Sequence, residues 1–111
     1  MEQFRAITKY VRVSPRKARL AADLIRGKGV LDAELQLKFC KMRAGKLLMK
    51  TLKSAVANAE TLGDANREKL LVDEVRVDEG PRMKRAKPRS KGGKHPIVKK
   101  MSHFTVVVRA G

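Results

Sequence analysis

The stretch that decides the fold is residues 80–101, GPRMKRAKPRSKGGKHPIVKKM. Between residues 81 and 101 it contains nine lysines and arginines and no acidic residue. Prolines and the pair Gly92-Gly93 interrupt it. A structureless loop of about 20 residues is uncommon inside a compact domain, and a glycine pair suits the two-residue turn of a hairpin. We therefore predict a long basic β-hairpin, with a disordered basic loop as the alternative.

The glycine turn also predicts which residues of the two arms face each other. With the glycine pair at the turn, Val77 lies opposite Val108 and Arg85 lies opposite Lys100. Each arm of about ten residues would reach roughly 30 Å. Because like charges opposite each other destabilise a ladder, we expect the outer part of the hairpin to be poorly ordered in the free protein.

Three segments alternate apolar and polar residues in the way that is typical of strands. They are residues 3–13, which we expect at a sheet edge, 69–79 and 103–109. The apolar residues that share one side are Ile7, Val11 and Val13 in the first, Leu71, Val75 and Val77 in the second, and Phe104, Val106 and Val108 in the third.

Helical periodicity predicts three helices, over residues 15–26, 32–40 and 42–62. Ser14 is a good N-cap for the first, and Gly27 ends it. Its apolar stripe consists of Ala18, Ala21, Ala22 and Ile25. The length of 111 residues favours a single domain over residues 1–111. We divide it into a globular body, residues 1–80 and 102–111, and an extended hairpin, residues 81–101.

The charge indicates a polyanionic partner. The chain has 27 lysines and arginines against 11 acidic residues, a formal net charge of +16. An anionic membrane or an acidic protein could balance this charge, but nucleic acid has the densest phosphates and is favoured. The single cysteine, Cys40, excludes an internal disulfide. The sequence shows neither a signal peptide nor an apolar run of about 18 residues, so we expect a cytosolic location.

Catalytic and metal chemistry find little support in the sequence. Asp73, Glu74, Asp78 and Glu79 are close in sequence, but neighbours on one strand alternate between its faces. Metal sites for phosphoryl chemistry need convergent carboxylates, so we interpret these residues as solvent-facing partners of nearby cations. His95 and His103 lack a second ligand at metal spacing. We expect no enzyme activity, no metal and no cofactor.

Folded RNA fits the distribution of cations better than DNA does. The first two predicted helices resemble a helix-turn-helix, yet the second carries Asp32 and Glu34 where DNA bases would lie. The basic residues come from the start of the first helix and from both hairpin arms. The basic stripe of the third helix is either a further contact surface or a solvated face. That spread suits an RNA recognised by its shape and phosphates. Because the chain has only four aromatic residues, we do not expect base stacking to be its main mode of RNA recognition.

Several motifs resemble the large ribosomal subunit protein twenty-two family, in order and spacing, over roughly residues 5–109. Residues 14–20, SPRKARL, and 22–27, ADLIRG, match its first helix, and residues 54–60, SAVANAE, match its third. The strongest match begins at residues 77–81, VDEGP. It continues through residues 83–85, 88–89 and 91–92 to SH at 102–103 and TVVV at 105–108.

The resemblance implies an α+β fold. Three helices pack on a small three-stranded antiparallel sheet, and two strands extend into a long basic hairpin. It implies a structural constituent of the large ribosomal subunit that organises ribosomal RNA, supports assembly and translation, and reaches the nascent-peptide exit tunnel. The implied partners are ribosomal RNA, neighbouring ribosomal proteins and the nascent chain. It implies no membrane, and a monomer outside the ribosome.

The RNA-binding residues that we predict fall into three groups. At the start of the first helix they are Arg12, Ser14, Arg16, Lys17 and Arg19. On the hairpin arms they are Arg82, Lys84, Arg85, Lys87, Arg89, Lys91, Lys94, Lys99, Lys100, Ser102 and His103. The tunnel tip is Gly92, Gly93, Lys94, His95 and Pro96.

The tip departs from the family pattern, because Gly93 stands where a basic residue is expected and Pro96 where arginine is common. Two other hypotheses remain. One is a DNA-compacting protein, which equal affinity for random duplex DNA would favour. The other is a phosphoryl-transfer enzyme, which metal-dependent turnover lost in Asp78→Ala would support.

Overall fold

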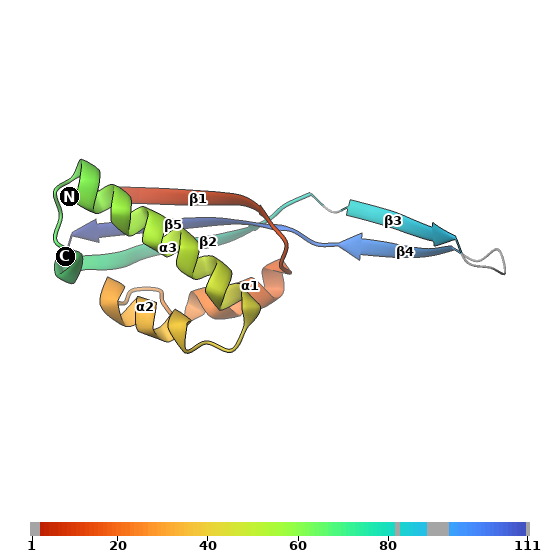
Figure 1. Cartoon of the computed structure of the whole chain (residues 1–111), viewed down its shortest axis with the longest axis horizontal. Helices are drawn as coiled ribbons and strands as arrows, with labels where there is room; N and C mark the ends of the chain where they lie inside the picture. The colour runs from red at the N-terminus through yellow and green to blue at the C-terminus, as the bar shows by residue number, and fades with distance from the viewer. Residues whose placement is uncertain (1–2, 82, 89–93, 111) are drawn as a thin grey trace.

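The molecule is long and narrow because a two-stranded arm projects from one end of a small body (Figure 1). The computed structural model describes residues 3–81, 83–88 and 94–110. The principal extents are 61 × 25 × 16 Å, and the radius of gyration is 17.0 Å. A compact chain of this length would have a radius of gyration of about 13 Å. The difference reflects the arm.

The body contains a three-stranded antiparallel sheet in the order β1-β5-β2. The strands are β1 (Gln3–Val11), β2 (Leu70–Glu79) and β5 (Ser102–Ala110). The predicted strands are confirmed, and β1 lies at an edge as expected. β5 is central and almost wholly buried, so the strand that continues from the hairpin is the one most firmly fixed in the body.

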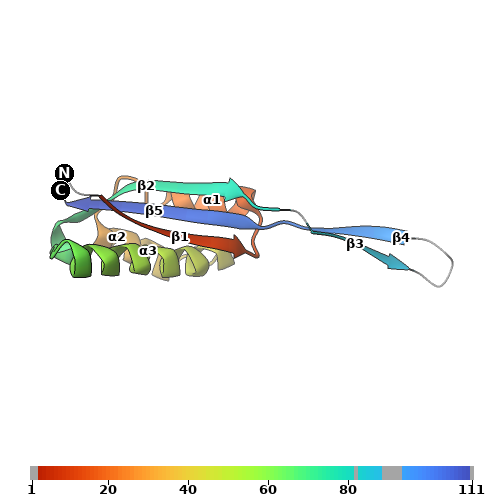
Figure 2. The same cartoon turned by 90° about the horizontal axis from the view of Figure 1, so that it is seen from above.

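Three helices cover one face of this sheet, as Figures 1 and 2 show. They are α1 (Pro15–Asp23), α2 (Val30–Lys38) and α3 (Arg43–Leu62), and a 3₁₀ turn, η1 (Arg67–Lys69), precedes β2. The predicted α+β class is therefore confirmed. α1 ends before the predicted residue 26, and α2 begins before the predicted residue 32. Backbone pairing ends α1 early, because the Gly27 N–H donates to the Val72 oxygen at 3.1 Å and draws the connection onto β2. α2 begins directly after Gly29, whose oxygen accepts from the Ala33 N–H at 2.9 Å.

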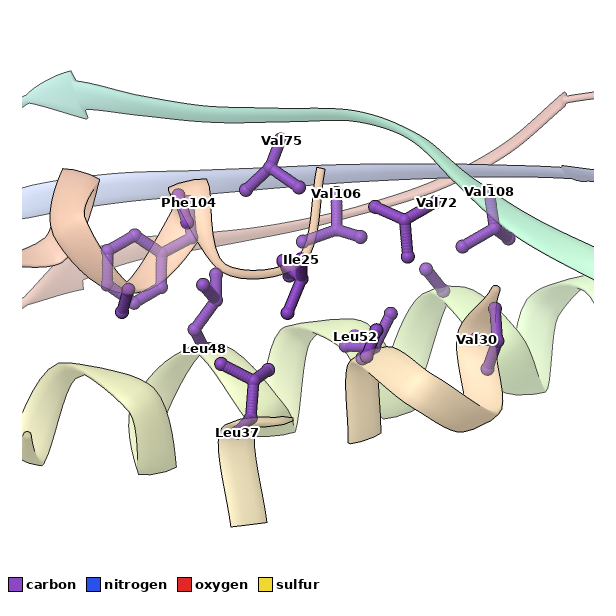
Figure 3. Packing of buried hydrophobic residues seen from close by; sticks show 14 of the residues in the cluster. Ile25, Val30, Leu37, Leu48, Leu52, Val72, Val75, Phe104, Val106 and Val108 are labelled. Carbon is purple, nitrogen blue, oxygen red and sulfur yellow. The ribbon is translucent and has the colours of Figure 1, made fainter. Parts of the chain in front are cut away.

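The core lies between the helices and the sheet. Figure 3 shows Phe104, Val106 and Val108 of β5 pointing towards Leu48 and Leu52 of α3. All five of these side chains are fully buried. The predicted stripe of the first helix is also buried: Ala18, Ala21, Ala22 and Ile25. These side chains anchor α1 on the sheet, and thereby fix its N-terminal end beside the hairpin.

Two β-bulges change which residues of the edge strands face the core. In β1, Phe4 and Ala6 pack against the core and Ile7 is 48% exposed, so the predicted side is wrong for Ile7. A register shift between Thr8 and Val11 then returns Val11 to the core side. A bulge inserts a residue into one strand and therefore reverses the alternation beyond it.

The same effect operates in β2. Leu70 and Val72 are buried there and Leu71 is only partly covered, contrary to the predicted side. A register shift between Val72 and Glu74 restores the alternation, so Val75 is buried as predicted.

The predicted register of the hairpin is wrong. Val77 pairs with Phe104 instead of Val108. In the arm, β3 (Met83–Pro88) pairs with β4 (Lys94–Lys99), and Arg85 faces Ile97 instead of Lys100.

The outermost described pair is Pro88 with Lys94. Lys94, His95 and Pro96, which we predicted at the tip, therefore belong to β4. The predicted turn at Gly92 and Gly93 lies outside the described residues.

Candidate nucleic-acid interface

The hairpin leaves the body at a root where three segments meet. We define the hairpin root as residues 12–17, 79–81 and 100–103. The Gly80 N–H donates to the Met101 oxygen at 2.8 Å, and a Cβ on Gly80 would lie 3.2 Å from the Met101 Cβ. The buried Ser102 hydroxyl donates to the Val13 oxygen at 2.8 Å. These contacts hold the start of α1 against the base of the arm.

Most of the predicted RNA-binding residues at the hairpin root are exposed. Arg12, Arg16, Lys17 and Lys100 all expose their side chains to solvent. Ser14 is the N-cap of α1, and its side chain makes no capping hydrogen bond. The N-terminal end of a helix adds a partial positive charge. The root therefore presents a surface that favours phosphate.

Two predicted RNA-binding residues have a structural role. Arg19 donates from Nε (3.3 Å) and Nη2 (3.1 Å) to the Val77 oxygen. Arg26, which was not among the predicted residues, makes the same kind of contact: it donates from Nε (3.2 Å) and Nη2 (3.0 Å) to the Val75 oxygen. β2 is an edge strand, so its outward carbonyls could otherwise pair with a strand of another molecule, and the two arginines occupy them. Ser102 is the second predicted residue whose polar group is used inside the fold.

The described part of the arm carries cations without placing them opposite one another. Across the six described pairs, each cation faces a residue that is neither lysine nor arginine. The pairs that contain a cation are Met83–Lys99, Lys84–Val98, Arg85–Ile97, Lys87–His95 and Pro88–Lys94. The like-charge pairing that we predicted for Arg85 is thus avoided by the register. Arg82, Arg89 and Lys91 lie outside the described residues.

A further basic surface follows α3. Arg43, Lys46, Lys50 and Lys53 are exposed. Among the described residues, none of the four makes an ion pair, in contrast to Arg67 and Arg109 of the body. These four cations are free to meet an anion, which the helical period alone did not establish.

Two acidic residues of β2 pair with arginines. Asp73 lies 3.0 Å from the Arg109 Nε, and Glu74 lies 3.1 Å from the Arg76 Nε. The interpretation of Asp73 and Glu74 as partners of nearby cations is confirmed. Within the described ranges, no three His, Cys, Asp or Glu side chains gather in a way that could hold a metal ion. The carboxylates therefore offer no convergent site.

A small α+β body with a projecting arm rich in lysine and arginine is typical of proteins that bind nucleic acid through an extension. Comparison with known proteins specifies the family. Residues 6–109 match the family described as Ribosomal protein L22p/L17e. The chain therefore belongs to this family of structural, non-enzymatic proteins of the large ribosomal subunit.

Individual relatives agree with this assignment. The large ribosomal subunit protein uL22 of Protochlamydia amoebophila is 64% identical over 108 residues, which cover 97% of each chain. The proteins of the same name from Chlamydia muridarum and Chlamydia trachomatis serovar L2 are each 54% identical over 105 residues, or 95% of each chain. The resemblance predicted from the motifs is confirmed. No helix in the described part of the chain has the length and apolar character needed to cross a membrane.

Proposed function

We propose that the protein organises large-subunit ribosomal RNA by inserting its arm between RNA elements while the hairpin root fixes the body against the RNA surface. The observation that carries this proposal is the arm itself, a two-stranded sheet separate from the body sheet. Among the described residues the arm strands pack mainly on each other, beyond the end of the body (Figure 1), so the arm gains further contacts from a partner. Its lysines and arginines require that partner to be a polyanion.

The hairpin root and the arm have different roles in this proposal. Root cations such as Arg12, Arg16 and Lys17 contact phosphates and set the orientation of the body, because phosphate contacts position a protein without reading sequence. The arm cations Lys84, Arg85, Lys87, Lys94 and Lys99 neutralise phosphates along the path of the hairpin. The outermost residues then reach the nascent-peptide exit tunnel and the nascent chain. Neighbouring ribosomal proteins contact the body.

Sedimentation of a bacterial lysate tests this function. The full chain, carrying an epitope tag, is expressed and followed through a sucrose gradient at moderate salt. We expect it in the fractions of large subunits and complete ribosomes. Recovery at the top of the gradient, or with the chromosome, would contradict the proposal and would favour the DNA-binding hypothesis.

A further inference from the structure

Tyr10 occupies a conformation that a bulky residue rarely adopts. Its φ is 59°, in the left-handed region, at the bulge near the end of β1. Such a backbone is strained for a side chain of this size, and strained residues cluster at functional sites. Tyr10 is 60% exposed, so burial of its side chain does not account for the strain.

His103 holds Tyr10 in this conformation. The Tyr10 N–H donates to the His103 Nδ1 at 3.1 Å. The two rings meet edge to face, with centroids 5.1 Å apart and an interplanar angle of 89°. Because Nδ1 accepts, the neutral imidazole carries its proton on Nε2, which is then a donor. The pair combines an exposed aromatic face with a polar edge.

His103 belongs to the hairpin root, so the pair lies beside the place where the body meets the arm. His103 approaches the root glycine closely, because a Cβ on Gly80 would lie 3.3 Å from the His103 Cε1. Arg12, two residues beyond Tyr10, and Lys100 are both exposed. Asp78 pairs with His103 across the ladder, and its carboxylate disfavours a phosphate at the imidazole edge. The surroundings therefore favour a base or ribose at the rings, with phosphates on the flanking cations.

We propose that Tyr10 is a stacking platform for one unpaired base of the ribosomal RNA. His103 fixes the tyrosine and donates from Nε2 to the base or ribose. This inference rests on the proposed RNA binding and adds a site that reads an unstacked nucleotide. Aromatic faces bind splayed bases of folded RNA and have no equivalent use on a fully paired duplex.

The tyrosine itself supplies the readout. The chain has one tyrosine and no tryptophan, so its intrinsic ultraviolet emission reports on Tyr10. The full chain is titrated with large-subunit ribosomal RNA transcribed in vitro, and separately with a fully paired RNA duplex at matched absorbance and occupancy. We expect the ribosomal RNA to quench the emission more strongly than the duplex does. Equal quenching by the two RNAs would overturn the stacking proposal.

Two variants test the energetic contribution. Tyr10→Phe keeps an aromatic face and should bind the ribosomal RNA like the natural chain. Tyr10→Leu should bind about 5- to 150-fold more weakly, the range for loss of one stacked base. The slope of log affinity against log salt concentration should not change, because tyrosine carries no charge. Wild-type affinity in Tyr10→Leu would contradict the proposal.

The quenching experiment uses the natural chain, so a folding defect in a variant does not affect its result. Salt-dependent binding without selective quenching would refute only the role of Tyr10. Absence of salt-dependent binding would refute the proposed function as well.

Discussion

Replacing Arg19 with methionine should destabilise the fold without removing a phosphate contact. Arg19 is exposed, yet both of its bonded groups donate to the Val77 oxygen, at 3.3 and 3.1 Å. Hydrogen bonds that involve a charged group contribute roughly 1.5–3 kcal/mol. These two are long and only partly buried, so we expect a loss below this range, about 1 kcal/mol. In a domain of this size that lowers Tm by roughly 4–8 °C.

Arg16→Met is the matched control. Arg16 lies on the same helix and is exposed, and no intramolecular hydrogen bond or ion pair of its side chain is found among the described residues. Arginine and methionine have similar helix propensities, so this variant should keep the natural Tm. It should instead reduce the slope of log affinity against log salt by about 0.7–0.9, the value for one phosphate contact.

Thermal unfolding and filter binding distinguish the two variants. Equal Tm values for the two variants, or a reduced salt slope for Arg19→Met, would refute the division between a cation that covers the β2 edge and a cation that contacts RNA.

Three further substitutions follow from the same structure, each measured by urea unfolding. Ser102→Ala removes the 2.8 Å hydrogen bond to Val13 and should cost about 1 kcal/mol, with no change in RNA affinity at a fixed salt concentration; weaker RNA binding by a folded variant would mean that Ser102 contacts RNA. Gly27→Ala places a Cβ at φ 75° and should cost about 1–2 kcal/mol; a neutral result would mean that the turn rearranges freely. Phe104→Ala empties a fully buried site and should cost about 3–5 kcal/mol; a loss below about 1 kcal/mol would show that the core is not closely packed there.

Local patterns predicted the elements well, because helix periodicity and capping depend on nearby residues. The stripe from Ala18 to Ile25 and the strand around Phe104 are both buried as predicted. Strand pairing depends on distant residues, and there the prediction failed. A single bulge reverses the sides of a strand, which is why Ile7 and Leu71 were placed on the wrong side. The described register also differs from that of a two-residue turn at the glycine pair.

The candidate site shows the same limit. Composition and the basic hairpin predicted where the cations lie, but not which of them are used inside the fold. Arg19 and Ser102 have the residue types of RNA contacts, and only the packing of α1 against β2 shows their other role. Tyr10 was not predicted as a site residue, because a positive φ on a tyrosine leaves no signal in the sequence. The bulge near Tyr10 can be recognised only from the register in which β1 pairs with β5.

The most direct test of the central claim is a salt titration of ribosomal RNA binding by two matched double variants. Lys84→Gln with Lys87→Gln removes two arm cations, and Lys28→Gln with Lys69→Gln removes two exposed cations near the start of β2. We predict that the arm variant lowers the salt slope by about 1.4–1.8 and that the body variant leaves it unchanged. An unchanged slope in the arm variant, or an equal decrease in both, would show that the hairpin is not the element that binds RNA.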